Sequence, residues 1–122
     1  RPLEHQEEDE NPDIVKVVRD QENFALYFSR APIPSSRSTT QIEGGEIHWS
    51  IIRRHIGLYA YRVNYLKYFL RQDSVPLERA EKLEQLRALW NGDSILVCDA
   101  VQAPGPGVDT LADLEKAILY FS

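Results

Sequence analysis

Residues 53–62 (RRHIGLYAYR) constrain the fold more than any other stretch of this chain. Apolar residues alternate along it with polar or polar-tipped ones, at Ile56, Leu58 and Ala60. This alternation predicts a buried strand, and because side chains repeat with a period of two, His55, Tyr59 and Tyr61 would share one side of it. Buried imidazole and phenol groups need hydrogen-bonding partners. That side is therefore either a set of satisfied polar groups or the wall of a polar site.

The remaining pattern predicts short strands and amphipathic helices in mixed order. Strands are expected at 14–18 and 24–28, joined by a turn at 20–23 into a hairpin, and at 94–101. Helices are expected at 65–70, at 74–91 and after Thr110. The long helix would begin at Ser74, stop before Gly92, and bury one stripe: Leu77, Ala80, Leu83, Leu86 and Trp90. Such an order favours an α/β protein with ligands near strand ends.

Composition excludes several classes of function. The chain has 122 residues, which suits one domain or a large part of one, and it starts with arginine, so we expect a fragment of a longer protein. Its net charge of −5 and its lack of a basic cluster argue against a nucleic-acid partner. No stretch approaches the ~20 apolar residues of a membrane span. The single cysteine, Cys98, cannot form an intrachain disulfide and is expected to be buried and inert.

Several polar residues are candidates for a site, each with a structural alternative. Glu84 and Gln85 lie beside the stripe of the long helix, where they face either a cleft or solvent. Asp109 ends a glycine-rich loop just before a helix, so it either caps that helix or binds Mg²⁺ beside phosphates. Neither common phosphate-binding glycine motif is present, and no Ser-His-Asp arrangement or zinc spacing is found.

Six separated segments together resemble one enzyme family. They are 11–18 (NPDIVKVV), 25–34 (ALYFSRAPIP), 54–62 (RHIGLYAYR), 76–78 (PLE), 81–87 (EKLEQLR) and 106–110 (PGVDT). In this order they resemble the C-terminal half of the CMP-KDO synthetases, or 3-deoxy-manno-octulosonate cytidylyltransferases. The resemblance implies a nucleotide-diphospho-sugar-transferase-like α/β fold, with a mixed sheet flanked by helices. Residues 1–122 would then form the sugar-acid- and metal-binding part of one cytidylyltransferase domain.

The same resemblance implies a reaction and a set of site residues. The family couples CTP to the sugar acid KDO, which gives CMP-KDO and pyrophosphate for lipopolysaccharide synthesis. The substrate-binding residues would be Arg30, His55, Tyr59, Glu84 and Gln85. Asp109 would bind Mg²⁺ together with an aspartate of the CTP-binding half, which is absent from these 122 residues. The resemblance further implies a cytoplasmic homodimer, and residues 1–122 alone are expected to be inactive.

Two other interpretations of the sequence stay open. A related cytidylyltransferase could act on another acidic sugar such as sialic acid, and titration with each sugar acid would separate the two. Alternatively, the polar face of the 53–62 stretch could bind a protein partner in a non-catalytic interaction domain. The interaction-domain hypothesis predicts that Asp109→Asn and Arg30→Ala leave the activity of that domain intact. The enzyme hypothesis predicts that they cause a loss of metal-dependent turnover.

Overall fold

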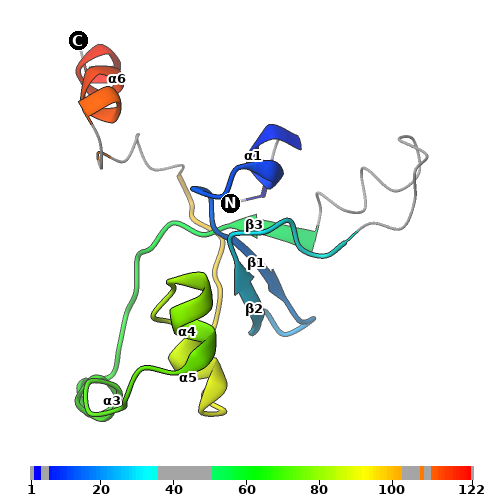
Figure 1. Cartoon of the computed structure of the whole chain (residues 1–122), viewed down its shortest axis with the longest axis vertical. Helices are drawn as coiled ribbons and strands as arrows, with labels where there is room; N and C mark the ends of the chain where they lie inside the picture. Colours follow the sequence, from blue (N-terminus) through cyan, green and yellow to red (C-terminus); the bar gives the residue numbers. More distant parts are fainter. Residues whose placement is uncertain (1, 4–5, 36–50, 103–107, 109–110, 122) are drawn as a thin grey trace.

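A three-stranded antiparallel sheet forms the centre of the computed structural model, which describes residues 2–3, 6–35, 51–102, 108 and 111–121. Its strands are β1 (Lys16–Arg19), β2 (Ala25–Ser29) and β3 (Ile52–Arg54), in the order β2-β1-β3 (Figure 1). Val17 lies opposite both Phe28 and Arg53, so these three side chains share one face. The expected α/β class is confirmed, but both strand pairings in the described residues are antiparallel, whereas a mixed sheet was expected.

The predicted hairpin of β1 and β2 is confirmed, and the turn that joins the strands explains why it forms. The Asp20 carboxylate accepts hydrogen bonds from the backbone N–H groups of Glu22 (2.8 Å) and Phe24 (2.9 Å). Asn23 has a φ of 69°, a left-handed conformation that asparagine tolerates better than most residues. Aspartate and asparagine thus provide the turn with local bonds that a strand would not supply.

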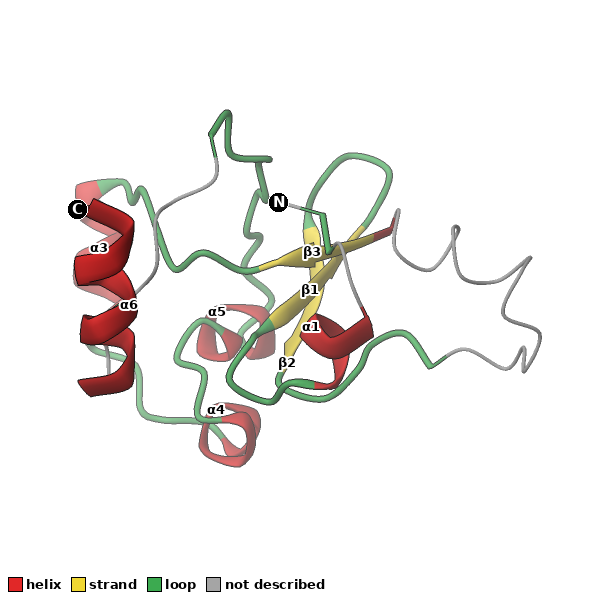
Figure 2. Cartoon of the chain, turned by 90° about the horizontal axis from the view of Figure 1, so that it is seen from above, coloured by secondary structure: helices red, strands yellow, loops and turns green. Residues whose placement is uncertain are grey.

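Five short helices complete the described part of the chain (Figures 1 and 2). They are α1 (Gln6–Glu10), α3 (Val63–Phe69), α4 (Pro76–Glu81), α5 (Leu86–Trp90) and α6 (Leu111–Phe121). The predictions of a helix at 65–70 and of another after Thr110 are confirmed by α3 and α6. Thr110, the expected cap of the last helix, lies outside the described residues. None of the helices in the described ranges is long and apolar enough to cross a membrane.

The single helix predicted at 74–91 is wrong, because the chain breaks into α4 and α5. Lys82 ends α4 in the left-handed conformation, with a φ of 54° and a ψ of 47°. Val75, rather than Ser74, occupies the position before α4. The break changes which residues are buried: Leu83 and Leu86 enter the core, whereas Ala80 and Trp90, also expected in the stripe, are exposed. The turn at Lys82 therefore lets Leu83 and Leu86 enter the core beside β1 and β2.

The strand predicted through 53–62 ends early, at Arg54. The last sheet-like contact is the backbone N–H of His55, which donates to the carbonyl of Val15 at 2.9 Å. Gly57 has a φ of 85°, which a strand does not allow, and the chain then continues as an extended segment to α3. We call residues 55–62 the extended segment. The prediction that this strand is buried is also wrong, because Ile56, Leu58 and Ala60 are exposed and no strand among the described residues pairs with the extended segment.

The strand predicted at 94–101 is also wrong. This stretch runs past the start of β2 with a single isolated bridge, between Phe24 and Leu96. Two backbone bonds hold it there, from Ala25 N–H to the Ile95 carbonyl (2.8 Å) and from Val97 N–H to the Asn23 carbonyl (2.8 Å). Cys98 is exposed rather than buried, because it lies beyond these contacts.

The core lies between the sheet and the turn that separates α4 from α5. Val15, Val17, Phe28, Leu83 and Leu86 form one buried cluster. Leu86 is fully buried, and a side chain of this size contributes about 1.5–3 kcal/mol when removed from water. The cluster fixes the position of α5 against β2, and thereby places the residues just before α5 next to the extended segment.

Candidate functional site

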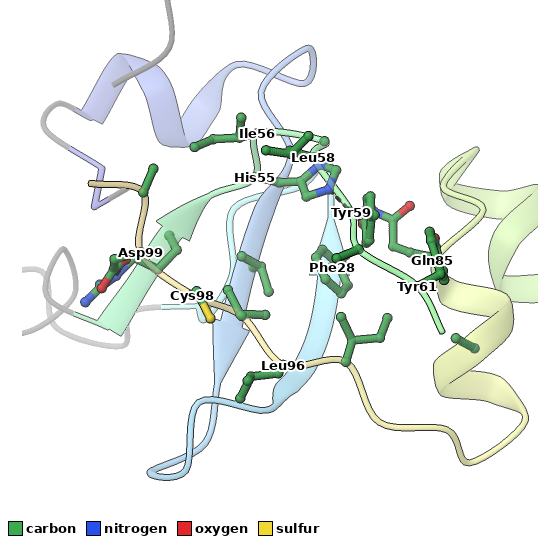
Figure 3. A pocket seen from close by; sticks show the side chains of 18 of the residues that line it. Phe28, His55, Ile56, Leu58, Tyr59, Tyr61, Gln85, Leu96, Cys98 and Asp99 are labelled. Carbon is green, nitrogen blue, oxygen red and sulfur yellow. Dashed lines mark hydrogen bonds and ion pairs between the residues drawn. The ribbon is translucent and has the colours of Figure 1, made fainter. Parts of the chain in front are cut away.

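A cavity of about 970 Å³ lies on the Val17–Phe28 face of the sheet. The extended segment forms one wall, residues 94–102 form another, and the start of α5 contributes a side chain between them. Figure 3 shows His55, Tyr59 and Gln85 near one end of the cavity, with Asp99 toward the other. A space of this size matches the usual volume of small-ligand sites.

His55 and Tyr59 are joined by a hydrogen bond of 2.8 Å between the imidazole Nε2 and the phenol oxygen. The His55 ring also meets the Phe28 ring edge-on, with the ring centroids 5.4 Å apart. Burial lowers the pKa of His55, so the imidazole is neutral at pH 7. Burial raises the pKa of Tyr59 far above its ordinary value, so its hydroxyl keeps its proton. The pair offers a ligand neutral donors and acceptors.

Stacked aromatic rings hold the extended segment in place. Tyr59 stacks on Tyr61 with centroids 5.7 Å apart, and Tyr61 stacks on Tyr65 of α3 at 6.2 Å. Tyr65 in turn stacks on Phe69, which is buried. Aromatic pairs at such distances contribute about 0.5–1.5 kcal/mol beyond the burial of their area. The expectation that His55, Tyr59 and Tyr61 gather on one side thus holds, although ring stacking rather than sheet pairing brings them together.

Gln85 carries the clearest sign of a missing ligand among the described residues. It stands just before α5 and lines the cavity, yet the residue is only 5% exposed. Its Nε2 group is buried and has no hydrogen-bond partner in the described part of the chain. An unsatisfied buried donor costs about 1–3 kcal/mol, so such groups are rare in proteins without a reason. A polar ligand in the cavity would satisfy it.

Glu84 and Arg30, two other predicted site residues, do not line this cavity. Glu84 is exposed; burial raises the pKa values of Tyr59 and Tyr61, and the charge of Glu84 adds to both shifts. Arg30 follows β2, where its Nε donates to the Glu81 carbonyl (2.9 Å) and its Nη1 to the Pro12 carbonyl (3.1 Å). The structure therefore brings His55, Tyr59 and Gln85 together and leaves Arg30 anchored to the protein.

The predicted metal residue, Asp109, lies outside the described residues. Within the described ranges, no group of three or more histidine, cysteine or acidic side chains could hold a metal ion. The assignment of Mg²⁺ to Asp109 therefore stays a prediction.

Asp99 is a cavity residue that the sequence reasoning missed. Its carboxylate accepts hydrogen bonds from Arg19 Nη2 and Arg53 Nε, each at 2.8 Å. The only signal in the sequence is a charge next to Cys98 at the end of an apolar run, and nothing in that run identifies its two partners. The two arginines fix residues 94–99 across the sheet.

Comparison with known proteins decides the family. A family model described as Cytidylyltransferase matches residues 1–95. This chain belongs to the cytidylyltransferase family. The 3-deoxy-manno-octulosonate cytidylyltransferase of Methylococcus capsulatus is 50% identical over 122 residues, and the one of Halorhodospira halophila is 53% identical over 105. The matches cover 99% and 85% of this cytidylyltransferase chain, but only 48% and 41% of the respective relatives.

A solved structure gives the same result for the fold. CMP:2-keto-3-deoxy-manno-octonic acid synthetase, in a complex with CTP, superposes with a TM-score of 0.81 at 38% sequence identity. The match covers 97% of this chain and 45% of that one. The expected resemblance and the nucleotide-diphospho-sugar-transferase-like fold are confirmed. This cytidylyltransferase chain spans about half the length of the relatives it matches.

Proposed function

We propose that this chain supplies the sugar-acid-binding part of a cytidylyltransferase that couples CTP to KDO and releases pyrophosphate. The observation that carries this proposal is the buried Gln85 amide, which has no partner among the described residues and lies in the same cavity as the His55–Tyr59 pair. The names of the relatives supply the chemical class of the missing ligand, because each is a 3-deoxy-manno-octulosonate cytidylyltransferase.

The chemistry of these side chains suits a polyhydroxylated acid. KDO carries hydroxyl groups and a carboxylate, so its pocket needs both donors and acceptors. Gln85 offers amide N–H donors, while the neutral His55–Tyr59 pair can accept or donate. Glu84 and Arg30 lie outside the lining of the cavity, so they would contact parts of the sugar acid that extend beyond it. Glu84 would accept from a hydroxyl, and Arg30 would bind the carboxylate or a hydroxyl through Nη2, which has no partner among the described residues.

In the proposed reaction, the anomeric hydroxyl of KDO attacks the α-phosphorus of CTP. An oxygen–phosphorus bond forms while the attacking hydroxyl loses its proton to water. The bond from the α-phosphorus to the bridging oxygen breaks, and pyrophosphate leaves with that electron pair. The residues of this chain contribute by holding the sugar acid at a fixed distance and orientation, an effect that lowers barriers without a covalent enzyme intermediate. The groups that bind CTP would come from the part of the relatives that this chain does not span.

The proposal also includes Mg²⁺, a homodimer and a cytoplasmic location, which rest on the resemblance alone. Asp109 would hold the metal ion together with an aspartate from outside these 122 residues. When bound, the ion would neutralise charge that develops on the phosphates. Light scattering of the full-length enzyme tests the dimer, and Asp109→Asn tests the metal site by its effect on Mg²⁺-dependent turnover.

A chimera tests the reaction directly. This chain replaces the matching segment of the Methylococcus capsulatus relative, so that both halves are present, and CMP-sugar formation is measured with KDO and with sialic acid. We expect turnover of KDO, none of sialic acid, and no CMP-KDO from residues 1–122 alone. A chimera that folds but turns over neither acid would refute the proposed function, and turnover of sialic acid alone would refute the choice of KDO.

A further inference from the structure

Arg30 is held by the protein through both its backbone and its side chain. Its backbone N–H donates to Glu81 Oε2 at 2.9 Å, and its carbonyl accepts from the ammonium of Lys16. Its Nε donates to the Glu81 carbonyl at 2.9 Å and its Nη1 to the Pro12 carbonyl at 3.1 Å. Arg30 is half-buried, and among the described contacts only its Nη2 is left for a ligand.

The Glu81 side chain serves almost entirely to fix the end of β2. Its Oε1 accepts from the Ser29 hydroxyl at 2.6 Å and from the Tyr27 hydroxyl at 3.4 Å, while Oε2 accepts from the Arg30 backbone. The Ser29 oxygen then accepts from the backbone N–H of Ala31 at 3.0 Å, which extends the network beyond Arg30. One carboxylate at the end of α4 thus sets the path of the chain on both sides of Arg30.

Lys16 supports the same residue from inside the sheet. Its side chain is fully buried, and its ammonium donates to the Asn11 carbonyl at 3.0 Å and to the Arg30 carbonyl. Burial lowers the pKa of Lys16, and the charges of Asp9 and Glu81 oppose that shift. A buried ion contributes little to stability compared with an apolar side chain of similar size. Packing alone therefore gives no reason for a lysine at the centre of this sheet.

We propose that Glu81 and Lys16 are positioning residues for Arg30, which they hold so that its guanidinium meets the sugar acid in one orientation. This inference rests on the proposed function, in which Arg30 contacts the substrate. Both residues act through Arg30 and touch no substrate themselves. A misplacement of about 1 Å in a group that binds substrate can reduce the reaction rate by as much as about a hundredfold. The anchoring of the backbone at Arg30 should therefore have a measurable effect on turnover.

The first test compares variants of the chimera described above. In Glu81→Gln, an amide group replaces one carboxylate oxygen, so the network loses an acceptor for either Ser29 or Arg30. In Lys16→Met, an apolar chain of similar length fills the buried site, so folding is retained while the contact with the Arg30 carbonyl is lost. For both variants we expect the KM for KDO to rise about tenfold, as the loss of one charged hydrogen bond implies, with the KM for CTP unchanged.

A matched control separates positioning from general destabilisation. Asp20→Asn also exchanges a carboxylate that accepts backbone N–H bonds for an amide, but it does so in the hairpin turn at the opposite end of β2. It should leave the KM for KDO within twofold of the parent chimera. Glu81→Asp, which restores the charge on a shorter side chain, should recover part of the loss.

Hydrogen exchange gives a readout that does not depend on activity. The backbone amide of Arg30 should exchange slowly in the parent chimera and at least tenfold faster in Glu81→Gln. If the parent makes no CMP-KDO but Arg30 is protected, the proposed function fails and the anchoring stands. If the parent is active and both variants keep the KM for KDO within twofold, or raise the KM for CTP equally, the positioning role is refuted.

Discussion

The ion pair of Glu78 and Arg87 should account for a measurable part of the stability of this chain. Arg87 donates to Glu78 from Nε at 2.9 Å and from Nη2 at 2.5 Å, and the two side chains are 15% and 13% exposed. Arg87 Nη1 also donates to the Gln72 carbonyl at 3.1 Å, and its guanidinium lies 4.8 Å from the centre of the Phe69 ring. One side chain thus joins the start of α4, α5 and the end of α3.

The magnitude follows from the effect of this pair on Glu78. Hydrogen bonds from Arg87 lower the pKa of Glu78 from 4.5 to about 2. A shift of that size corresponds to about 3 kcal/mol, and measured values for partly exposed pairs are smaller. We therefore expect Glu78→Gln to lower the free energy of unfolding by about 2 kcal/mol at pH 7. Because the pKa is depressed in the folded state, this contribution is complete above pH 4.5 and is lost as the pH falls toward 2.

Urea unfolding at pH 7, 4.5 and 3, followed by circular dichroism, measures this effect without adding salt. The difference in the free energy of unfolding between the parent chain and Glu78→Gln should become smaller as the pH falls from 7 to 3. Glu22 is an exposed carboxylate in the hairpin turn and serves as the control. Its substitution, Glu22→Gln, should change the free energy of unfolding by less than about 0.5 kcal/mol at pH 7. A difference for Glu78→Gln that is below 0.5 kcal/mol at pH 7, or that stays constant with pH, would refute the reasoning.

Three further outcomes are expected. Gln85→Met should raise the KM for KDO of the chimera at least tenfold without lowering its melting temperature, because the buried amide it removes has no partner; a lowered melting temperature would contradict this. Since burial lowers the pKa of His55, stability should decrease as the pH falls below about 6.5, and His55→Gln should flatten that dependence in thermal melts. Asp99→Asn should lower the free energy of unfolding, measured in urea, by about 1 kcal/mol. The substitution removes the ion pairs with Arg19 and Arg53, and the effect is small because water screens these partly exposed pairs.

Local signals in the sequence predicted the hairpin and the shorter helices well. Aspartate and asparagine in the turn at 20–23, β-branched residues in β1 and helical spacing in α3 each act within a few residues. The family motifs also predicted His55, Tyr59 and Gln85 as substrate-binding residues, although only the structure shows that they line one cavity.

The errors arose where distant contacts override local preference. Residues 55–62 and 94–101 were predicted as strands, but the structure describes only an isolated bridge at Leu96 in these stretches. A strand forms only where a neighbouring strand pairs with it, and the alternation of apolar residues does not identify that neighbour. Likewise, helix-forming residues run through 74–91 without a glycine or proline after Pro76 to mark the break at Lys82. The partners of Asp99 lie 80 and 46 positions away, beyond any periodicity.

The left-handed turn at Lys82 has a consequence for engineering this chain. A residue with a Cβ atom in this conformation costs about 1–2 kcal/mol relative to glycine, so Lys82→Gly should raise the melting temperature where most substitutions lower it. Lys82 does not line the cavity, so the gain would not depend on sugar binding. Such a variant would provide a tolerant background for libraries at Gln85 and Tyr59, in which destabilising side chains that alter sugar preference could still fold.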